Sequence, residues 1–271
     1  MMDLARADTK PAWCPGCGNY GILKAINAAM AEAGADRKRL VLVSGIGQAA
    51  KLPHYLAEPA NVFNGLHGRA VPAATGIKLA NHELNVVVTS GDGDMYGEGG
   101  NHLLHAMRRN IGIRCFVHNN QVYGLTKGQA SPTSDSGFMT LLQSHGVMAQ
   151  PFNPMALAII NNVTFVARSF SGDFEHLKSM MIEAMKADGF ALLDILQPCV
   201  TFNKVNTFAW YRQRVKPIGP QHDPYDRRKA LDLAFMWGDE IPIGVYYRSK
   251  RPSFESQLAL LKHGPLAAVA R

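Results

Sequence analysis

Residues 84–94 read Leu-Asn-Val-Val-Val-Thr-Ser-Gly-Asp-Gly-Asp, an apolar run that passes directly into a glycine-rich turn. A short apolar run of this kind indicates a strand buried on both faces of a parallel sheet. Ligands of such sheets bind beyond the carboxyl ends of the strands. Glycines at 91 and 93 let the backbone approach a phosphate closely, and Asp92 offers the hard oxygen that Mg²⁺ prefers. We therefore expect a metal–phosphate site at this turn.

A second polar turn follows the next apolar run, Ile113 to Val117. It carries Asn119-Asn120, and Asn120 lies 28 positions after Asp92. The helix-like stretch 101–109 between the two runs completes one strand–helix–strand unit, which brings both turns to the same sheet edge. A Gly-Asp-Gly alone is weak evidence, and an Asn-Asn pair is usually a turn. Together they predict a Mg²⁺ site made by Asp92, Asn120 and the Val122 carbonyl, with room for two diphosphate oxygens and water.

Strand-like and helix-like stretches alternate along most of the chain. The strand-like runs are 40–43, 84–89, 113–117, 163–167 and 191–196, and the helix-like stretches are 21–32, 72–80, 101–109, 153–161 and 174–186. This alternation predicts an α/β fold with a doubly wound, mostly parallel sheet. The pattern weakens after Pro198. We therefore predict a cofactor-binding domain over 1–203 and an irregular C-terminal extension over 204–271 that packs on a partner.

Composition narrows the class of protein. The chain has 271 residues, 47% of them hydrophobic, and a formal charge of +7. It has no apolar run long enough to span a membrane, and its first eleven residues lack the apolar centre of a signal peptide, so we expect a cytoplasmic protein. The positive charge is dispersed and suits an acidic protein partner as well as nucleic acid. A zinc-stabilised nucleic-acid binder would leave the two polar turns unexplained, and we predict no nucleic-acid partner.

The cysteines suggest a metal site. Four cysteines are too few for a disulfide scaffold at this length. Cys14 and Cys17 lie in a Cys-Pro-Gly-Cys turn that can aim both sulfurs inward, and Cys199 follows a predicted strand. With a fourth ligand they would complete a 4Fe–4S or a zinc site, which spacing alone does not separate. We expect Cys115, inside a predicted strand, to be a buried apolar residue.

The two polar turns resemble the thiamine-diphosphate motif. The segments around them resemble the β subunit of the 2-oxoacid:ferredoxin oxidoreductases, in its 2-oxoglutarate or broad 2-oxoacid type. These segments are Trp13-Cys-Pro-Gly-Cys-Gly18, Ser44-Gly-Ile-Gly47, His67-Gly-Arg-Ala70 and Tyr123-Gly-Leu-Thr-Lys-Gly-Gln129. They occur in the family's order and extend the resemblance from Trp13 to about Asn203.

The resemblance implies a set of site residues. His67 belongs to the family's cofactor-contacting His-Gly-Arg segment, and lysines at the places of Lys51 and Lys127 line its substrate pocket. By chemistry alone, either lysine could be an ordinary surface residue. A 2-oxoacid carboxylate needs a cation, however, and two cations favour the dicarboxylate 2-oxoglutarate. The expected cofactor-binding residues are Gly47, Gln48, His67, Gly91, Asp92, Gly93, Asp94, Asn120, Val122, Gly124, Leu125 and Thr126; the expected catalytic residues are Lys51, Lys127 and His67.

The resemblance also implies a reaction and an assembly. The reaction is thiamine-dependent oxidative decarboxylation of a 2-oxoacid, with 2-oxoglutarate as the expected substrate, to its acyl-CoA, with electrons passing to ferredoxin. The alternative is a non-redox thiamine enzyme half, such as a decarboxylase or a transketolase-like subunit. In the family an α subunit supplies the pyrimidine-binding half of the site. We therefore expect a heteromer, built as a dimer of αβ heterodimers.

The chain departs from the family at one metal-binding position. There, Ser-Gly-Ile-Gly is followed by a cysteine, whereas this chain has Gln48. Three alternatives stay open: a cluster held by three thiolates with water, Gln48 or another ligand; a lost cluster with another electron path; or a substitution introduced into this chain. Because Cys14, Cys17 and Cys199 are all present, we favour a 4Fe–4S cluster.

Overall fold

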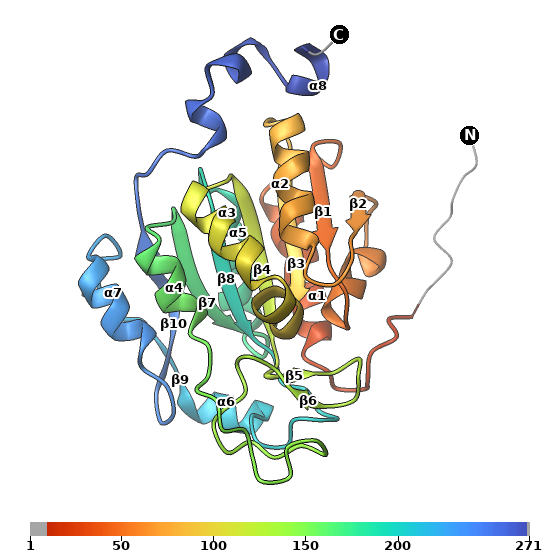
Figure 1. The fold of residues 1–271 in the computed structure, drawn as a ribbon, viewed down its shortest axis with the longest axis vertical. Helices are drawn as coiled ribbons and strands as arrows, with labels where there is room; N and C mark the ends of the chain where they lie inside the picture. The colour runs from red at the N-terminus through yellow and green to blue at the C-terminus, as the bar shows by residue number, and fades with distance from the viewer. Residues whose placement is uncertain (1–9, 270–271) are drawn as a thin grey trace.

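An eight-stranded sheet forms the centre of the protein in the computed structural model, which describes residues 10–269 (Figure 1). Its strand order is β2-β1-β3-β4-β8-β7-β10-β9. The strands are β1 (Leu40–Ser44), β2 (Asn61–Asn64), β3 (Asn85–Gly91), β4 (Ile113–Asn119), β7 (Phe165–Phe170), β8 (Ala191–Leu196), β9 (Val215–Pro217) and β10 (Ile241–Arg248). Every neighbouring pair is parallel except β10 with β7. The predicted doubly wound, mostly parallel sheet is confirmed.

Side chains from the two faces of the sheet enter separate cores. Leu40 and Leu42 of β1 pack with α1 (Asn19–Glu32) and α5 (Phe174–Met185). Val41 and Val43, which point the other way, pack with α2 (Ala70–Ala80), α3 (Gly100–Arg109) and α4 (Pro154–Ile160). Because both faces are covered, these strands are apolar without alternation. Cys115 is fully buried in the second core, as expected of an apolar residue.

The segment after residue 203 is more regular than its weak sequence pattern indicates. It forms α6 (Phe208–Arg214), β9, α7 (Arg227–Ala234) and β10, and ends in short turns and α8 (Leu266–Val269). β10 extends the sheet by pairing with β7, and its register shifts between Val245 and Tyr247. That irregularity and Pro242 inside the strand disguise it in the sequence. Sequence patterning also missed β2, an exposed edge strand. The division at residue 203 and the packing on a partner stay predictions.

The register of the central strands assembles one functional edge. Gly91 of β3 lies opposite His118 of β4, and Asn119 lies opposite Leu196 of β8. The turns after these three strands therefore leave the sheet side by side. The small hairpin β5 (Val122–Tyr123) and β6 (Gln129–Ala130) and the loop after it lie at this same edge, in the lower part of Figure 1.

No helix within residues 10–269 is long and apolar enough to span a membrane. Most of the amino-terminal segment that we expect not to be a signal peptide lies outside the described residues.

Candidate active site

The three predicted Mg²⁺ ligands lie together at the sheet edge. The backbone N–H of Asn120 donates to Oδ1 of Asp92 over 3.4 Å, and the Asn120 side-chain oxygen accepts from the N–H of Val122 at 3.0 Å. Gln121, with φ of +60°, turns the chain between them. The turn after β3 and the turn after β4 are thus in contact through the residues expected to hold the metal.

A single cavity surrounds these ligands. Every residue that the sequence analysis assigned to the cofactor lines it, from Gly47 to Thr126. It is also lined by Ile46, Ala49 and Tyr123, which the sequence analysis did not assign to the cofactor. The structure therefore gathers residues from four separate segments into one place. Their contact with a cofactor stays a prediction.

Two hydroxyl groups support Asp92 from a distant part of the chain. Ser131 and Thr133 donate to its Oδ2 at 2.5 and 2.6 Å. Burial nevertheless raises the pKa of Asp92 to about 6, although these hydroxyls lower it. Its Oδ1 accepts the long contact from the Asn120 N–H, which leaves acceptor capacity free. A buried carboxylate with a free oxygen beside an amide oxygen fits Mg²⁺. Sequence reasoning missed both hydroxyls, because nothing local links them to Asp92.

Two glycines are required by close approach. A Cβ atom on Gly93 would lie 2.4 Å from the ring of Tyr123, and a Cβ on Gly45 would lie 1.8 Å from Oδ2 of Asp94. No real side chain tolerates contacts this short. The Gly-Asp-Gly and Ser-Gly-Ile-Gly motifs therefore leave space for neighbouring side chains, beyond any role toward a phosphate.

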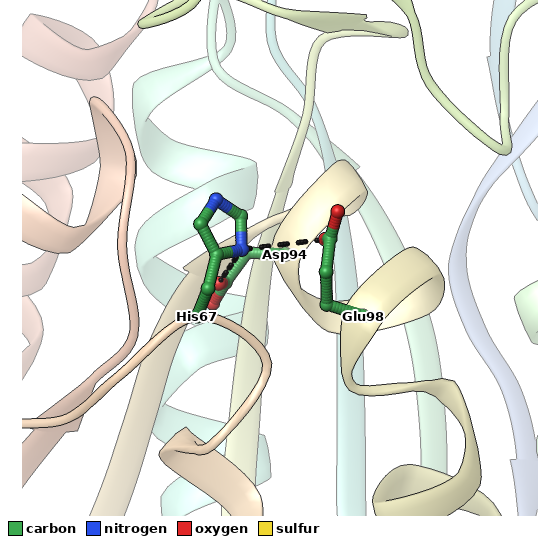
Figure 2. Close-up of side chains that lie close together, drawn as sticks. All are labelled: His67, Asp94 and Glu98. Carbon is green, nitrogen blue, oxygen red and sulfur yellow. Dashed lines mark ion pairs between the residues drawn. The ribbon is translucent and has the colours of Figure 1, made fainter.

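His67 is held by two carboxylates (Figure 2). Its Nδ1 lies 2.8 Å from Oδ1 of Asp94 and 3.3 Å from Oε2 of Glu98, while Nε2 points away from both. Asp94 is buried, and its carboxylate also accepts from the Gly68 N–H at 2.8 Å. Glu98 is more exposed and accepts from the Tyr123 hydroxyl at 3.1 Å. Asp94, expected to bind the cofactor, thus also positions His67.

The π-helix Gly93–Glu98 explains this arrangement. The wider π turn closes on the Asp94 carbonyl, which accepts from the Gly99 N–H at 2.9 Å. It brings the side chains of Asp94 and Glu98 to the same imidazole. Within residues 10–269, these three residues are the one His/Cys/Asp/Glu group whose ligand atoms all lie within 4.8 Å of one another.

The three predicted cluster ligands line a second cavity. Cys14 and Cys17 come from one turn, and Cys199 comes from the loop after β8. The turn is fixed beside that loop, because the Gly18 N–H donates to the Pro198 carbonyl at 3.2 Å. Burial raises the pKa of the Cys17 thiol to about 11, so a metal would have to displace its proton.

The two cavities share a wall. Gln48, Asn120 and Gly124 line both of them. A cofactor beside Asp92 and a metal group beside the cysteines would therefore be neighbours, separated by single residues. This adjacency suits electron transfer between the two groups.

Neither predicted substrate lysine lines the cavity around Asp92. Lys51 is half-buried in the 3₁₀ helix Ala49–Tyr55, and Lys127 is exposed, with φ of +78°. Lys127 lines a neighbouring groove with Thr126 and Phe202. Their contact with a substrate stays a prediction.

Two family models match consecutive parts of the chain. The model described as "Thiamine pyrophosphate enzyme, C-terminal TPP binding domain" matches residues 24–195. The model for the C-terminal part of the pyruvate ferredoxin oxidoreductase β subunit matches residues 199–263. The chain belongs to the β subunits of the 2-oxoacid:ferredoxin oxidoreductases. It is thus an oxidoreductase subunit with a thiamine-diphosphate-binding domain, as the sequence resemblance indicates.

Individual relatives agree with this assignment. The chain is 45% identical over 258 residues to the 2-oxoacid:ferredoxin oxidoreductase β subunit of Sulfolobus sp, covering 91% of this chain and 85% of that one. It is 39% identical to the 2-oxoglutarate synthase subunit KorB of Archaeoglobus fulgidus, covering 96% and 93%. A solved 2-oxoglutarate:ferredoxin oxidoreductase of Magnetococcus marinus, with 2-oxoglutarate, coenzyme A and succinyl-CoA bound, superposes with a TM-score of 0.90 at 36% identity, covering 95% of this chain and 88% of that one.

Proposed function

We propose that this chain binds thiamine diphosphate through Mg²⁺ and takes part in oxidative decarboxylation of 2-oxoglutarate to its CoA thioester. Asp92, Asn120 and the Val122 carbonyl hold the metal in this proposal. Its main support is the shared wall between the cavity around Asp92 and the cavity around the cysteines. A redox enzyme needs the carbon chemistry and the electron exit to be adjacent, whereas a non-redox thiamine enzyme has no use for the cysteines.

Within this reaction the chain positions the cofactor and gives electrons an exit. Bound thiamine diphosphate supplies a nucleophilic carbon for the 2-oxo group and a sink for the electrons left when CO₂ departs. His67 presents Nε2 beside the cofactor, with its ring orientation fixed by Asp94. Cys14, Cys17 and Cys199 would hold a 4Fe–4S cluster, which would supply a path for electrons toward ferredoxin.

The site is completed by an α subunit in this proposal. Several large apolar side chains are exposed near the cofactor edge: Phe63 (46%), Leu66 (77%), Met139 (70%), Leu141 (98%), Leu142 (75%) and Met148 (96%). Exposed apolar side chains gathered on a few segments are typical of a protein–protein interface. We propose that they are covered by the α subunit, which also supplies the pyrimidine-binding half. We further propose a dimer of αβ heterodimers, in which residues 204–271 pack on the partner.

Substrate choice rests on the two lysines. Lys127 lines an open groove next to the cofactor cavity, together with Phe202. With Lys51 as a second cation for the substrate, Lys127 would pair with the distal carboxylate of 2-oxoglutarate. The names of the Archaeoglobus and Magnetococcus relatives also carry 2-oxoglutarate. Reduced thiols and a ferredoxin partner favour a cytoplasmic location for the proposed activity.

The proposal is tested on the complex of this chain with its α subunit. We expect bound thiamine diphosphate and Mg²⁺, and viologen reduction that depends on coenzyme A and is faster with 2-oxoglutarate than with pyruvate. An Asp92→Ala complex serves as the control and should lack both cofactor and activity. A preference for pyruvate would overturn the substrate assignment. Release of CO₂ without viologen reduction would instead support a non-redox decarboxylase.

A further inference from the structure

Besides the three cysteines, the wall of this cavity contains the amide side chain of Gln48, together with the polar side chains of Asn19, Asn120, Gln197 and Thr201. Gln48 follows β1 in the chain, whereas the cysteines come from residues 14–17 and from the loop after β8. Its backbone is fixed in place, because its carbonyl accepts from the indole N–H of Trp13 at 2.9 Å. The amide therefore reaches the cavity from an anchored position.

The side-chain oxygen of Gln48 is fully buried and accepts no hydrogen bond from any residue in 10–269. A buried acceptor without a partner destabilises the fold, because its lost hydration is not replaced. The side-chain oxygen of Gln197, in the same cavity wall, is unpartnered as well, but the Gln197 amide already donates to Sγ of Cys17 and to the Pro198 carbonyl. The Gln48 oxygen can donate a lone pair to a metal held by the thiols. Gln48 is thus a candidate ligand on grounds independent of the cysteines.

The spacing of the sulfurs favours a multi-iron cluster over a single zinc ion. Within the described part of the chain, Cys14, Cys17 and Cys199 do not form a set with all three sulfurs within 4.8 Å of one another. Two sulfurs bound to one Zn²⁺ at about 2.3 Å each lie at most about 4.6 Å apart. At least one sulfur pair is therefore farther apart than two ligands of a single zinc ion, a spacing that a multi-iron cluster accommodates.

We propose that the amide oxygen of Gln48 holds the fourth iron of a 4Fe–4S cluster whose other three irons are bound by Cys14, Cys17 and Cys199. This inference rests on the cluster in the proposed function and adds its fourth ligand. Thiolates suit iron–sulfur clusters, whereas a neutral amide oxygen is a harder and weaker donor. One iron is therefore held less firmly than the other three.

The consequence is a cluster that loses one particular iron on mild oxidation. Ferricyanide takes one electron from the 4Fe–4S²⁺ form, the fourth iron leaves as Fe²⁺, and a 3Fe–4S⁺ form remains on the three thiolates. Charge balances: the 4Fe–4S²⁺ form gives 3Fe–4S⁺, Fe²⁺ and one electron, and ferricyanide takes up that electron to become ferrocyanide. The Gln48 oxygen is then free to rebind Fe²⁺ on reduction.

The experiment uses the αβ complex purified without oxygen and treated with ferricyanide. Released Fe²⁺ is followed with a chelator, and the three-iron form by electron paramagnetic resonance. We expect the wild-type complex to release its fourth iron and give the three-iron signal, and Gln48→Cys to retain all its iron. Gln48→Leu, of similar size but without the oxygen, should lose the fourth iron at least about tenfold faster than the wild type. Mössbauer spectra should show one iron unlike the other three in the wild type, and four alike in Gln48→Cys.

Several results would overturn the inference. Equal iron loss from the wild type and Gln48→Leu would show that Gln48 is not a ligand. If the wild type retained its iron as well as Gln48→Cys does, the fourth iron would not be weakly bound. If the complex purified without oxygen contained zinc, or no metal at all, the proposed cluster would be refuted. If Gln48→Leu fails to fold, the wild-type Mössbauer spectrum and Gln48→Cys still decide. None of these readouts needs turnover, so an intact cluster without 2-oxoacid activity would count against the proposed reaction alone.

Discussion

Nδ1 of His67 lies 2.8 Å from Oδ1 of Asp94, and Asp94 is itself buried and held by the Gly68 N–H. The carboxylate accepts, so the imidazole donates from Nδ1 and keeps Nε2 for another partner. Figure 2 shows Nε2 directed away from both carboxylates. Asp94 therefore fixes both the tautomer and the orientation of a ring that lines the cofactor cavity.

Asp94→Ala should lower kcat of the 2-oxoacid-dependent reaction and leave the KM for the 2-oxoacid nearly unchanged. The ring of His67 would lose its fixed orientation. We expect a fall of up to about a hundredfold, the lower end of what a positioned acid or base contributes. Glu98→Gln is the control, because its oxygen is farther, at 3.3 Å, and more exposed. Equal effects of the two substitutions would contradict the positioning role of Asp94.

Thr133→Val should weaken Mg²⁺-dependent binding of thiamine diphosphate by about 10–100-fold, the usual effect of removing a group that supports a metal ligand. The Thr133 hydroxyl donates to Asp92 at 2.6 Å and is buried there. Calorimetric titration of the complex with Mg²⁺ and thiamine diphosphate measures the effect. Thr75→Val is a matched control, since that hydroxyl donates only within α2, to the Val71 carbonyl. The same loss in both variants would refute a specific role for Thr133.

Asp194→Ala should destabilise the chain by about 3–5 kcal/mol, because it leaves the buried guanidinium of Arg168 unpaired. Asp194 accepts from Arg168 at 2.9 Å and from the amide of Asn119 at 3.1 Å, so it also supports the turn that carries Asn120. Urea unfolding measures the loss. Replacing the pair together, as Arg168→Met with Asp194→Leu, should cost less than Asp194→Ala alone. A double variant no more stable than the single one would contradict this account.

His176 makes stability sensitive to mild acid. Burial lowers its pKa below the ordinary value, although Asp173 opposes the shift. The unfolded chain then takes up a proton that the folded chain refuses, so stability falls as the pH drops below about 6.5. His176→Gln should unfold at the same urea concentration as the wild type near neutral pH and at a higher one in mild acid. Parallel pH profiles of the two proteins would rule out this contribution.

Lys127→Ala should raise the KM for 2-oxoglutarate more than the KM for pyruvate. Only 2-oxoglutarate has a distal carboxylate, which would lose its cationic partner. Because Lys127 is exposed, the substitution should have little effect on stability. Steady-state viologen reduction with both 2-oxoacids measures the ratio. Lys186→Ala is the control, because that exposed lysine pairs with Glu183 at the end of α5 and does not line the groove. Equal changes for the two substrates would remove Lys127 from substrate selection.

Local sequence patterns are sufficient to predict the central sheet and the proximity of Asp92 to Asn120. Strand period, turn chemistry and parallel pairing all follow from neighbouring residues, and the register then aligns the two turns. β10 was missed because its pattern is broken by Pro242 and by the register shift near Val245. Here, tertiary pairing with β7 overrides a weak local signal.

The supporting groups of the site lie beyond such patterns. Ser131 and Thr133 reach Asp92 across 39 and 41 positions, through a path fixed by the β5–β6 hairpin. Asp94 supports His67 because of a π turn. From its position next to the Gly-Asp-Gly motif, Asp94 was expected to contact the cofactor instead. Distances of this kind come from the path of the backbone, which residue types alone do not determine.

The contact between Gly45 and Asp94 has a genetic consequence. A methyl group at position 45 would occupy the space of the carboxylate oxygen, so the two positions share one fixed volume. In a library of random variants, Gly45→Ala should be rejected alone and be tolerated for folding when Asp94→Gly accompanies it. The rescued chains would fold but leave His67 without its anchor. A side chain at position 45 therefore requires an accompanying loss of the Asp94 carboxylate, and selection for activity opposes that loss.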